Sequence, residues 1–422
     1  MGMANDLILI FLALELLSFP LYILAVVAWP RADSEESAMK YFILGAFSSA
    51  IFIYGVALVY GATGTTALPG IVAAAEGGTT TLLLAGAALI LVGFAFKIAA
   101  VPFHMWTPDV YEGAPTVVTA FMSVGAKAGG FAALLRILIV ALPTLGETWA
   151  AAISVLAALT LIVGNLLAIA QPNIKRMLGY SSIAHAGYIL IAVAASFENP
   201  DGISAALFYI FAYTFTNLGA FAIAVAVERK EGEGVMLDDY KGLARRYPLP
   251  AIVMAFFMLS LTGIPPTGGF AAKFYVFSSA VEAGLIWLVL IGVITSVVSA
   301  YYYLRVVFLM YMYALRVALV DLRAFDLVFV NDAAVVEHHP DGSVRVRQAF
   351  DLIGPGALGG VIWGALVGLI FLSPWLGAAL GGVAGALAGK LTDIGIDDDF
   401  IDEVGRQVQP GHSAFFMLID NW

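Results

Sequence analysis

The sequence predicts an all-α polytopic membrane protein, from its composition and from the spacing of its apolar runs. Of the 422 residues, 61% are hydrophobic and 12% are charged, and the mean hydropathy is +0.95. Soluble chains are about 45–50% apolar and about 25% charged. A water-exposed globule of this composition would present large apolar patches, so a soluble enzyme fold is excluded. The net charge of −10 argues against a nucleic-acid partner.

Nine apolar stretches before residue 314 are long enough to cross a bilayer. Crossing about 30 Å of hydrocarbon requires roughly 20 apolar residues. The third and eighth stretches are overlong and contain proline, which removes a backbone donor and interrupts a helix. The expected spans are approximately 7–28, 41–61, 81–112, 115–142, 149–170, 176–197, 203–228, 249–281 and 284–313.

The charges of the connections support this count and predict the orientation. Connections after spans two, four, six and eight contain acidic residues but no lysine or arginine. By the positive-inside rule, the odd-numbered connections are cytoplasmic and the N-terminus faces outside. The basic residues that follow spans one, five and seven are Arg31, Lys40, Lys175, Arg176, Arg229, Lys230, Lys241, Arg245 and Arg246.

Five ionisable residues fall inside the apolar stretches: Glu15, Lys97, Lys127, His185 and Lys273. A charge at the bilayer centre costs roughly 2.5–3.5 kcal/mol on insertion scales. Snorkelling side chains or structural ion pairs are one interpretation. A proton or ion relay is the other, because burial disfavours an ammonium whereas a nearby carboxylate favours it, so a Glu/Lys couple can switch its charge. For the histidine, a satisfied interior residue is nearly as good an interpretation.

Prolines interrupt the two overlong stretches close to a lysine. Pro102 and Pro108 follow Lys97, and Pro265 and Pro266 precede Lys273. Broken helices occur at membrane depth where they are buried in protein or line a wet cavity. Two such breaks in corresponding positions of two halves indicate an inverted-repeat transporter.

Four motifs carry a close family resemblance over residues 5–313. They are FKIAAVPFHMWTPDVYEGAPTVVTAFMSVGAKAGG, YSSIAHAGY, LSLTGIPPTGGFAAKFYVF and SVVSAYYYLRVV. They closely resemble subunit N of proton-pumping NADH:quinone oxidoreductases (respiratory complex I), a family similar to the cation/proton antiporter subunits of multisubunit sodium/proton antiporters. The resemblance implies two inverted five-helix repeats, each with a broken helix, in a multi-pass protein of the bacterial inner membrane.

The resemblance also implies roles for the ionisable residues in proton translocation coupled to quinone reduction elsewhere in a complex. By motif position, Glu15 is similar to the carboxylate of the first half-channel and Lys97 to its broken-helix partner. Lys127 is similar to the connecting lysine and Lys273 to the lysine of the second broken helix. His185 lies in the region between the half-channels.

The resemblance implies a translocase subunit that carries no redox cofactor itself. NADH, FMN, iron–sulfur clusters and quinone belong to the rest of such a complex. The chain has no cysteine, which removes thiolate-ligated clusters, and we expect no metal site. The expected partners are the lipid bilayer, protons and neighbouring membrane subunits, especially antiporter-like ones.

Two other functions stay open at this point. The chain could be a subunit of a secondary sodium/proton antiporter, or a truncated, non-pumping protein that serves assembly. The family has about four helices before the one that corresponds to the Glu15 stretch. The resemblance therefore implies an N-terminally truncated antiporter-like transmembrane domain over residues 1–313.

Residues 314–422 follow a different pattern. They contain six Lys/Arg and thirteen Asp/Glu, a net of −7, which leaves −3 for the first 313 residues. The run AAVVEHHPDGSVRVRQ predicts a β-hairpin around Pro340-Asp341-Gly342. Glycine at every fourth position then predicts a glycine-zipper helical hairpin over 354–390, because such a stripe allows close backbone approach. Its glycines are Gly356, Gly360, Gly364, Gly368, Gly377, Gly381, Gly385 and Gly389. The segment resembles the DUF1269 family, which implies a small α/β segment around that hairpin.

Overall fold

The computed structural model divides the chain into two compact units, Met1–Ala314 and Leu315–Trp422. It describes residues 1–228, 234–319, 330–338, 344–348 and 413–419. Side chains are described up to residue 312. Among the basic residues of the predicted connections, Arg229 and Lys230 lie outside the described residues.

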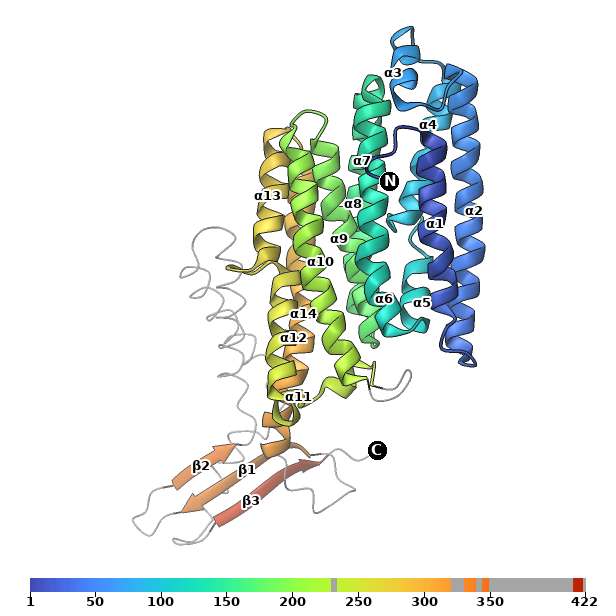
Figure 1. The fold of residues 1–422 in the computed structure, drawn as a ribbon. Coiled ribbons are helices and arrows are strands. Elements are labelled where there is room, and N and C mark those ends of the chain that lie inside the picture. Colours follow the sequence, from blue (N-terminus) through green and yellow to red (C-terminus); the bar gives the residue numbers. More distant parts are fainter. Residues whose placement is uncertain (229–233, 320–329, 339–343, 349–412, 420–422) are drawn as a thin grey trace. The chain divides into compact units, whose positions relative to one another are not determined.

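Among the described residues, seven helical segments are long and apolar enough to cross a membrane (Figure 1). They are α1 (Leu7–Ala25), α2 (Ala32–Thr63), the segment Thr116–Ala141, α8 (Gly146–Ile169), α9 (Ile174–Ala195), α10 (Asp201–Val227) and α14 (Ile286–Leu319). The segment Thr116–Ala141 consists of α6 (Thr116–Phe121), π-helical η1 (Met122–Ala126), α7 (Lys127–Arg136) and π-helical η2 (Ile137–Ala141). Shorter helices are α3 (Leu68–Glu76), η3 (Pro143–Leu145), η4 (Leu237–Tyr240) and α11 (Leu243–Arg246).

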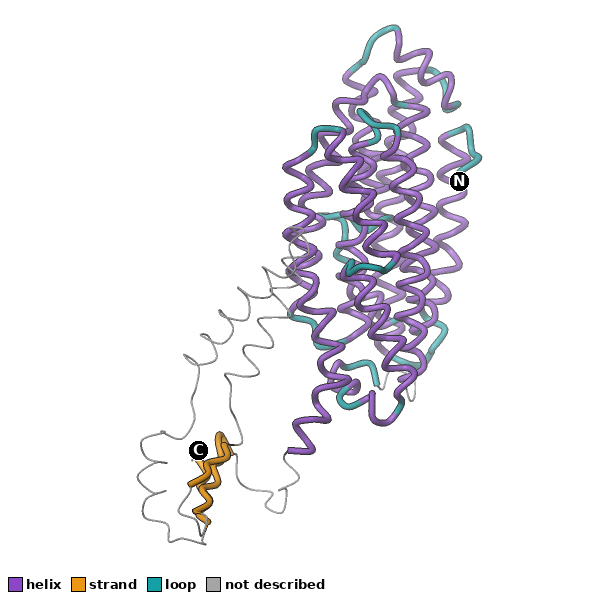
Figure 2. The backbone as a smooth tube through the Cα atoms, turned by 90° about the vertical axis from the view of Figure 1, so that its left-hand side faces the viewer, coloured by secondary structure: helices purple, strands orange, loops and turns teal. Residues whose placement is uncertain are grey.

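The two overlong stretches each form two helices. They are α4 (Thr81–Lys97) followed by α5 (Trp106–Gly113), and α12 (Pro248–Thr262) followed by α13 (Gly268–Glu282). Figure 2 shows loop segments partway along the helices as well as at their ends. Among the described residues before position 314, seven continuous and two broken segments confirm the prediction of about nine spans. The third and eighth spans run in opposite directions because four spans, an even number, lie between them, as an inverted repeat requires.

Particular residues mark where helices begin and end. Asp6 caps α1 through its carboxylate, which accepts from the backbone N–H of Ile8 at 2.8 Å. Gly263 ends α12 with φ +89°, a left-handed conformation that glycine adopts without a steric penalty. Ala99, two residues after α4, has φ +62°, which is costly for alanine and is typical of a backbone held by its surroundings.

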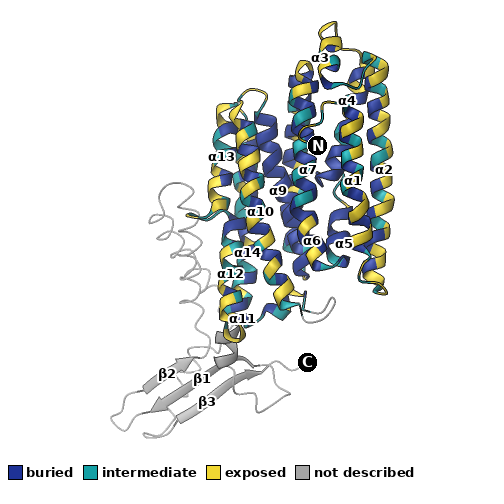
Figure 3. Ribbon diagram, viewed as in Figure 1, coloured by how far each residue is buried: buried dark blue, intermediate teal, exposed yellow. Residues whose placement is uncertain are grey.

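Helix α9 lies at the centre of the first unit. Every residue from Met177 to Ala195 is buried, whereas α1, α2 and α10 have exposed apolar faces (Figure 3). A helix that is apolar and buried on all sides belongs to the interior of a bundle. Polar groups on α9 are therefore shielded from lipid and require partners within the protein.

The connections with lysine and arginine share one end of the first unit. Figure 1 labels α5 and α11 at that end and α3 at the opposite end. Lys175 departs from the expectation for a basic loop residue. It is only 1% exposed, and its ammonium donates to the carbonyl of Ala114 at 2.6 Å.

The second unit contains a three-stranded antiparallel sheet of order β2-β1-β3. Its strands are β1 (Val330–His338), β2 (Val344–Gln348) and β3 (Ser413–Ile419). The β1–β2 register, with Val336 opposite Val346, confirms the predicted β-hairpin. The predicted glycine-zipper hairpin over 354–390, with all eight of its glycines, lies outside the described residues.

Candidate functional site

The ionisable residues of the apolar stretches lie in the interior of the first unit. Lys97, Lys127, His185 and Lys273 are 4–7% exposed, and Glu15 is half-buried. They come from five spans: α1, α4, the start of α7, α9 and α13. Each of the four buried groups has polar neighbours, which offset part of the cost of removing it from water.

At the first break, Glu15 and Lys97 have separate partners. Ser49 Oγ donates to Glu15 Oε1 at 2.5 Å, and the Lys97 ammonium donates to Ser18 Oγ. With these separate serine partners, no direct ion pair joins the two groups in the described part of the chain. Both line a cavity of about 20 Å³. A water molecule needs roughly 10–15 Å³, so this cavity is large enough to hold one between the charges.

Helix ends stabilise the two break lysines in a similar way. Lys97 is the last residue of α4, and the Lys273 ammonium donates to the carbonyl of Thr262, the last residue of α12, at 2.8 Å. A helix C-terminus carries a partial negative charge that favours a cation. Each lysine is therefore placed at the negative end of the first half of its broken helix.

The surroundings of Lys273 contain hydroxyl, carbonyl and aromatic groups. Its ammonium donates to Ser296 Oγ at 2.8 Å and lies 4.6 Å from the centroid of the Tyr188 ring. An aromatic face attracts a cation within about 6 Å. No carboxylate is among the described hydrogen-bond partners of this lysine, whereas Lys97 at least shares a cavity with Glu15.

Lys127 follows a π-helical turn and points to α9. Its ammonium donates to the carbonyl oxygen of Ser182 and, at 2.6 Å, to the Ser182 hydroxyl. Asn217 of α10 donates to Ser123 Oγ in η1 at 2.7 Å, and the side-chain carbonyl of Asn217 is buried without a described partner. π-helical turns occur often at functional sites because they shift the register of the following side chains.

His185 has a hydroxyl partner on each ring nitrogen. Nδ1 lies 2.7 Å from the Tyr209 hydroxyl, and Nε2 lies 3.1 Å from the Tyr303 hydroxyl. The Tyr303 hydroxyl also lies 2.5 Å from Ser181 Oγ. Residues of α9, α10 and α14 thus form one polar chain in the centre of the unit.

The four prolines predicted at the helix breaks lie at or next to them. Pro102 falls between α4 and α5, and Pro265 and Pro266 fall between α12 and α13. Pro108 is the third residue of α5, inside the first turn. A proline is tolerated there because the first backbone N–H groups of a helix have no intrahelical partner.

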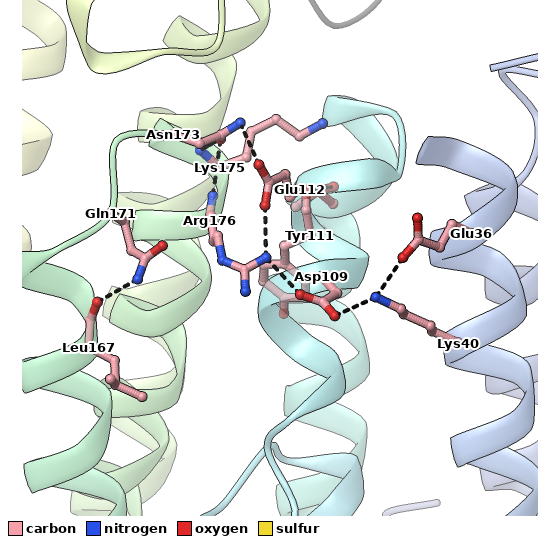
Figure 4. A network of polar contacts seen from close by, with 11 residues as sticks. Glu36, Lys40, Asp109, Tyr111, Glu112, Leu167, Gln171, Asn173, Lys175 and Arg176 are labelled. Carbon is pink, nitrogen blue, oxygen red and sulfur yellow. Dashed lines mark hydrogen bonds and ion pairs between the residues drawn. The ribbon is translucent and has the colours of Figure 1, made fainter. Parts of the chain in front are cut away.

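Charged residues at the basic end form a second cluster (Figure 4). Asp109 of α5 accepts from Lys40 of α2 and from Arg176 of α9, both at 2.7 Å. Arg176 also contacts Glu112 at 2.8 Å, and Lys40 contacts Glu36 at 2.7 Å. These ion pairs line a cavity of about 280 Å³ and tie the second half of the first broken helix to its neighbours.

Replacing Asp109 with asparagine is expected to lower stability by about 1 kcal/mol. The substitution weakens two ion pairs, and because the side chains are about one-third exposed, solvent screening reduces their contribution. The measurement is the thermal unfolding midpoint of the purified protein in detergent at low and high salt. Asp238→Asn, which loses one exposed pair with Lys241, is the control and should have almost no effect. Equal midpoints for Asp109→Asn and the unmodified protein would contradict the expectation.

Several polar partners were not predicted from the sequence. Ser18, Ser49 and Ser182 are serines within apolar stretches, and Tyr209 and Tyr303 belong to aromatic-rich spans. Serine and tyrosine are common enough in membrane helices that neither type marks a site by itself. The available signal was helical spacing: Ser182 and His185 are three residues apart and share one side of α9.

Within the described ranges, no three His, Asp or Glu side chains are grouped so that they could hold a metal ion.

The fold and the site define a class: multi-pass membrane proteins with two oppositely directed broken helices, each carrying a buried lysine. A family model described as NADH:quinone oxidoreductase/Mrp antiporter, transmembrane, matches residues 4–299. The chain belongs to this family, which confirms the resemblance found in the sequence. It is a multi-pass protein of a bacterial inner membrane. A second model, of proteins of unknown function (DUF1269), matches residues 357–422.

Curated relatives are similar over most of the first unit. NADH-quinone oxidoreductase subunit N of Chloroflexus aggregans is 53% identical over 317 residues, covering 74% of this chain and 65% of the relative. The protein of the same name from Trichlorobacter lovleyi is 54% identical over 314 residues, covering 74% and 64%. The chain therefore spans just under two thirds of the length of these relatives.

Solved structures have the same architecture. A chain of respiratory complex I from Thermus thermophilus is 42% identical with a TM-score of 0.64, covering 73% of this chain and 66% of that one. A chain of the Mrp complex from Dietzia sp. is 28% identical with a TM-score of 0.67, covering 73% and 57%.

Proposed function

We propose that this chain is a membrane subunit of an NADH:quinone oxidoreductase and moves protons across the membrane while quinone is reduced in other subunits. The observation that carries the proposal is the set of buried lysines, Lys97, Lys127 and Lys273, on separate helices of one unit. Ionisable groups held inside a membrane domain at such a cost mark ion and proton pathways.

In this proposal, Glu15 and Lys97 form the switchable element of the first half. Their shared cavity allows the lysine to exchange its Ser18 contact for a water-bridged contact with the carboxylate. An ammonium next to a carboxylate keeps its proton, and an ammonium moved away in a buried site releases it. The pair therefore stores and releases one proton as the separation changes.

The centre and the second half of the unit continue the path. Lys127 exchanges protons with the α9 region through Ser182, and His185 relays them. Lys273 serves the exit half, where hydroxyl and carbonyl groups replace a carboxylate. The proposed partners are other membrane subunits, especially antiporter-like ones. NADH, FMN, iron–sulfur clusters and quinone would be bound by the rest of the complex. The lack of cysteine bears only on the clusters, because this chain has no thiolate to ligate one.

A sodium/proton antiporter subunit is the second candidate. The similarity to a chain of the Mrp complex from Dietzia sp. favours it, but the identity of 28% is below the 42% to the complex I chain. A non-pumping assembly protein is the third candidate. A role in assembly alone does not explain the buried lysines, because they are costly to insert and would serve no purpose in such a protein.

The partner set tests the proposal. The affinity-tagged full chain, expressed in its own cell and purified in mild detergent, should bring down subunits that oxidise NADH. The preparation should show NADH:quinone activity and, in vesicles, acidify the lumen when NADH is added. Recovery with antiporter subunits alone, together with sodium-driven proton movement, would overturn the proposal in favour of the second candidate.

A further inference from the structure

The polar chain around His185 is continuous over four groups. Ser181 Oγ lies 2.5 Å from the Tyr303 hydroxyl, which lies 3.1 Å from His185 Nε2. His185 Nδ1 lies 2.7 Å from the Tyr209 hydroxyl. All four residues are at most 5% exposed. At this burial, each polar hydrogen and lone pair is strongly held by its neighbour in the chain.

Two hydrogen arrangements satisfy these contacts equally. In the first, Ser181 donates to Tyr303, Tyr303 donates to Nε2, and the Nδ1 hydrogen is donated to Tyr209. In the second, every donation is reversed, and the imidazole hydrogen is on Nε2. Neutral histidine has one donor and one acceptor nitrogen, and hydroxyls both donate and accept, so both arrangements are complete.

We propose that the polar chain of Ser181, Tyr303, His185 and Tyr209 is a single-file proton relay. The tautomer of His185 sets its direction, and Tyr303 and Tyr209 are the relay groups on either side. The inference rests on the proposed function and adds its central step. A proton that arrives at Ser181 displaces the Ser181 hydrogen to Tyr303. The Tyr303 hydrogen moves to Nε2, and the Nδ1 hydrogen moves to Tyr209, which releases its own proton onward. One proton enters, one leaves, and the chain is left in the second arrangement.

The reset of this chain limits it to one proton at a time. A hydroxyl returns to its first orientation by rotating about its C–O bond, but an imidazole hydrogen cannot change nitrogen by rotation in place. A second proton in the same direction therefore requires a ring flip of His185 or an exchange of its proton with water. The ring is confined by Tyr213, Tyr209 and Tyr188, with centroids 4.7, 5.8 and 5.8 Å away. The relay thus passes one proton and must be reset before it can pass another in the same direction.

Each end of the polar chain lies beside a residue that contacts a lysine of the proposed path. Ser181 is adjacent in sequence to Ser182, which accepts from Lys127. At the other side, the Tyr209 ring stacks on Tyr188 at 6.0 Å, and Tyr188 is the ring beneath Lys273. The Tyr213 ring lies next to the His185 ring, and the Tyr213 hydroxyl is buried without a described partner. Unpaired buried hydroxyls are usual positions for ordered water, which would connect the chain to its neighbours.

Two adjacent tyrosines supply a matched test. Tyr302 and Tyr303 are 1% and 0% exposed, and their rings contact each other at 4.4 Å. Tyr302 donates to Asn165 instead of His185, at 3.0 Å. The variants Tyr303→Phe, Tyr209→Phe and Tyr302→Phe each remove one buried hydroxyl, but only the first two interrupt the relay. They are compared in the assembled complex in membrane vesicles, with assembly checked on native gels.

With assembly retained, NADH-driven proton translocation should fall at least about fivefold in Tyr303→Phe and Tyr209→Phe and stay within about twofold in Tyr302→Phe, because positioned proton-transfer groups contribute large factors. The ratio of rates in H₂O and D₂O should rise in the first two variants only, since proton transfer then limits the rate. Equal rates in all three variants, or equal losses with an unchanged isotope ratio, would overturn the relay.

A further variant separates this inference from the proposed function. If Lys97→Ala abolishes translocation while Tyr303→Phe leaves it unchanged, the relay is wrong and the proposed function stands. If Lys97→Ala also leaves translocation unchanged, the proposed function fails and the relay fails with it.

Discussion

Replacement of Lys97 with alanine is expected to reduce coupled proton translocation at least about tenfold while the complex still assembles. A positioned proton-transfer group contributes roughly 10²- to 10⁴-fold to a rate. Among the residues that the structure describes, no other ammonium lines the cavity shared with Glu15. Within the described part of the chain, Lys97 makes no ion pair that alanine would break, and alanine removes a buried charge that is costly to insert. Folding should therefore be retained. The measurement is NADH-driven acidification in vesicles, normalised to the complex seen on native gels.

A second substitution at the same position distinguishes a relay from a structural charge. Lys97→Arg retains a positive charge at the end of α4, but guanidinium does not release its proton in proteins. If the lysine only balances Glu15 and the helix end, the arginine variant should pump normally. If it must release a proton, the arginine variant should fail like alanine. Lys241→Ala, at a loop residue paired with Asp238, is the surface control and should leave translocation unchanged. Normal pumping by Lys97→Ala would show that the relay interpretation is wrong.

The spans could be predicted from the sequence because the bilayer limits the possible structures. Hydrophobic length fixes the number of crossings, and prolines in the overlong stretches fix the breaks. The predictions for 81–112 and 249–281 each correspond to two helices, α4–α5 and α12–α13. The short helix α3 could not be predicted, because its nine residues are too few to span the bilayer.

The individual partners of the ionisable residues were harder to predict. Tyr301, Tyr302 and Tyr303 are identical and consecutive, yet the first is 53% exposed and the others are buried. Successive residues on a helix differ by about 100° in direction, so a shift of one position decides which tyrosine meets His185. Sequence periodicity locates the buried face of α14 but does not give its rotation to that accuracy.

The separation of Glu15 from Lys97 has a similar cause. The sequence places them on different helices, and their distance depends on how closely α1, α2 and α4 pack. Glycines set part of that distance: a Cβ added at Gly55 of α2 would lie 2.8 Å from the backbone oxygen of Gly86 in α4. Close α2–α4 packing leaves room for a small cavity at Glu15 and Lys97. Glu15 and Lys97 thus line the same cavity. When they do not contact each other, Glu15 is bound by Ser49 and Lys97 by Ser18.

Replacement of Gly164 with leucine is expected to destabilise the first unit by more than about 3 kcal/mol, at the upper end of the usual cost of overpacking. A Cβ at Gly164 in α8 would lie 2.7 Å from the backbone nitrogen of Ala184 in α9. Backbone cannot yield as a flexible side chain does, so α9 must move away from α8. Because His185 follows Ala184, its contacts with Tyr209 and Tyr303 should be lost together with stability.

The measurement is the amount of folded protein in the membrane and its thermal unfolding midpoint in detergent, with Gly164→Ala as an intermediate case. Gly61→Leu is the matched control, because a Cβ there would meet only the end of the Leu82 side chain, at 3.4 Å. Gly61 is exposed, so leucine at that position should leave both quantities unchanged. Equal behaviour of Gly164→Leu and Gly61→Leu would mean that α8 and α9 do not approach as closely as their backbones indicate. The position of His185 would then depend on α10 and α14 alone.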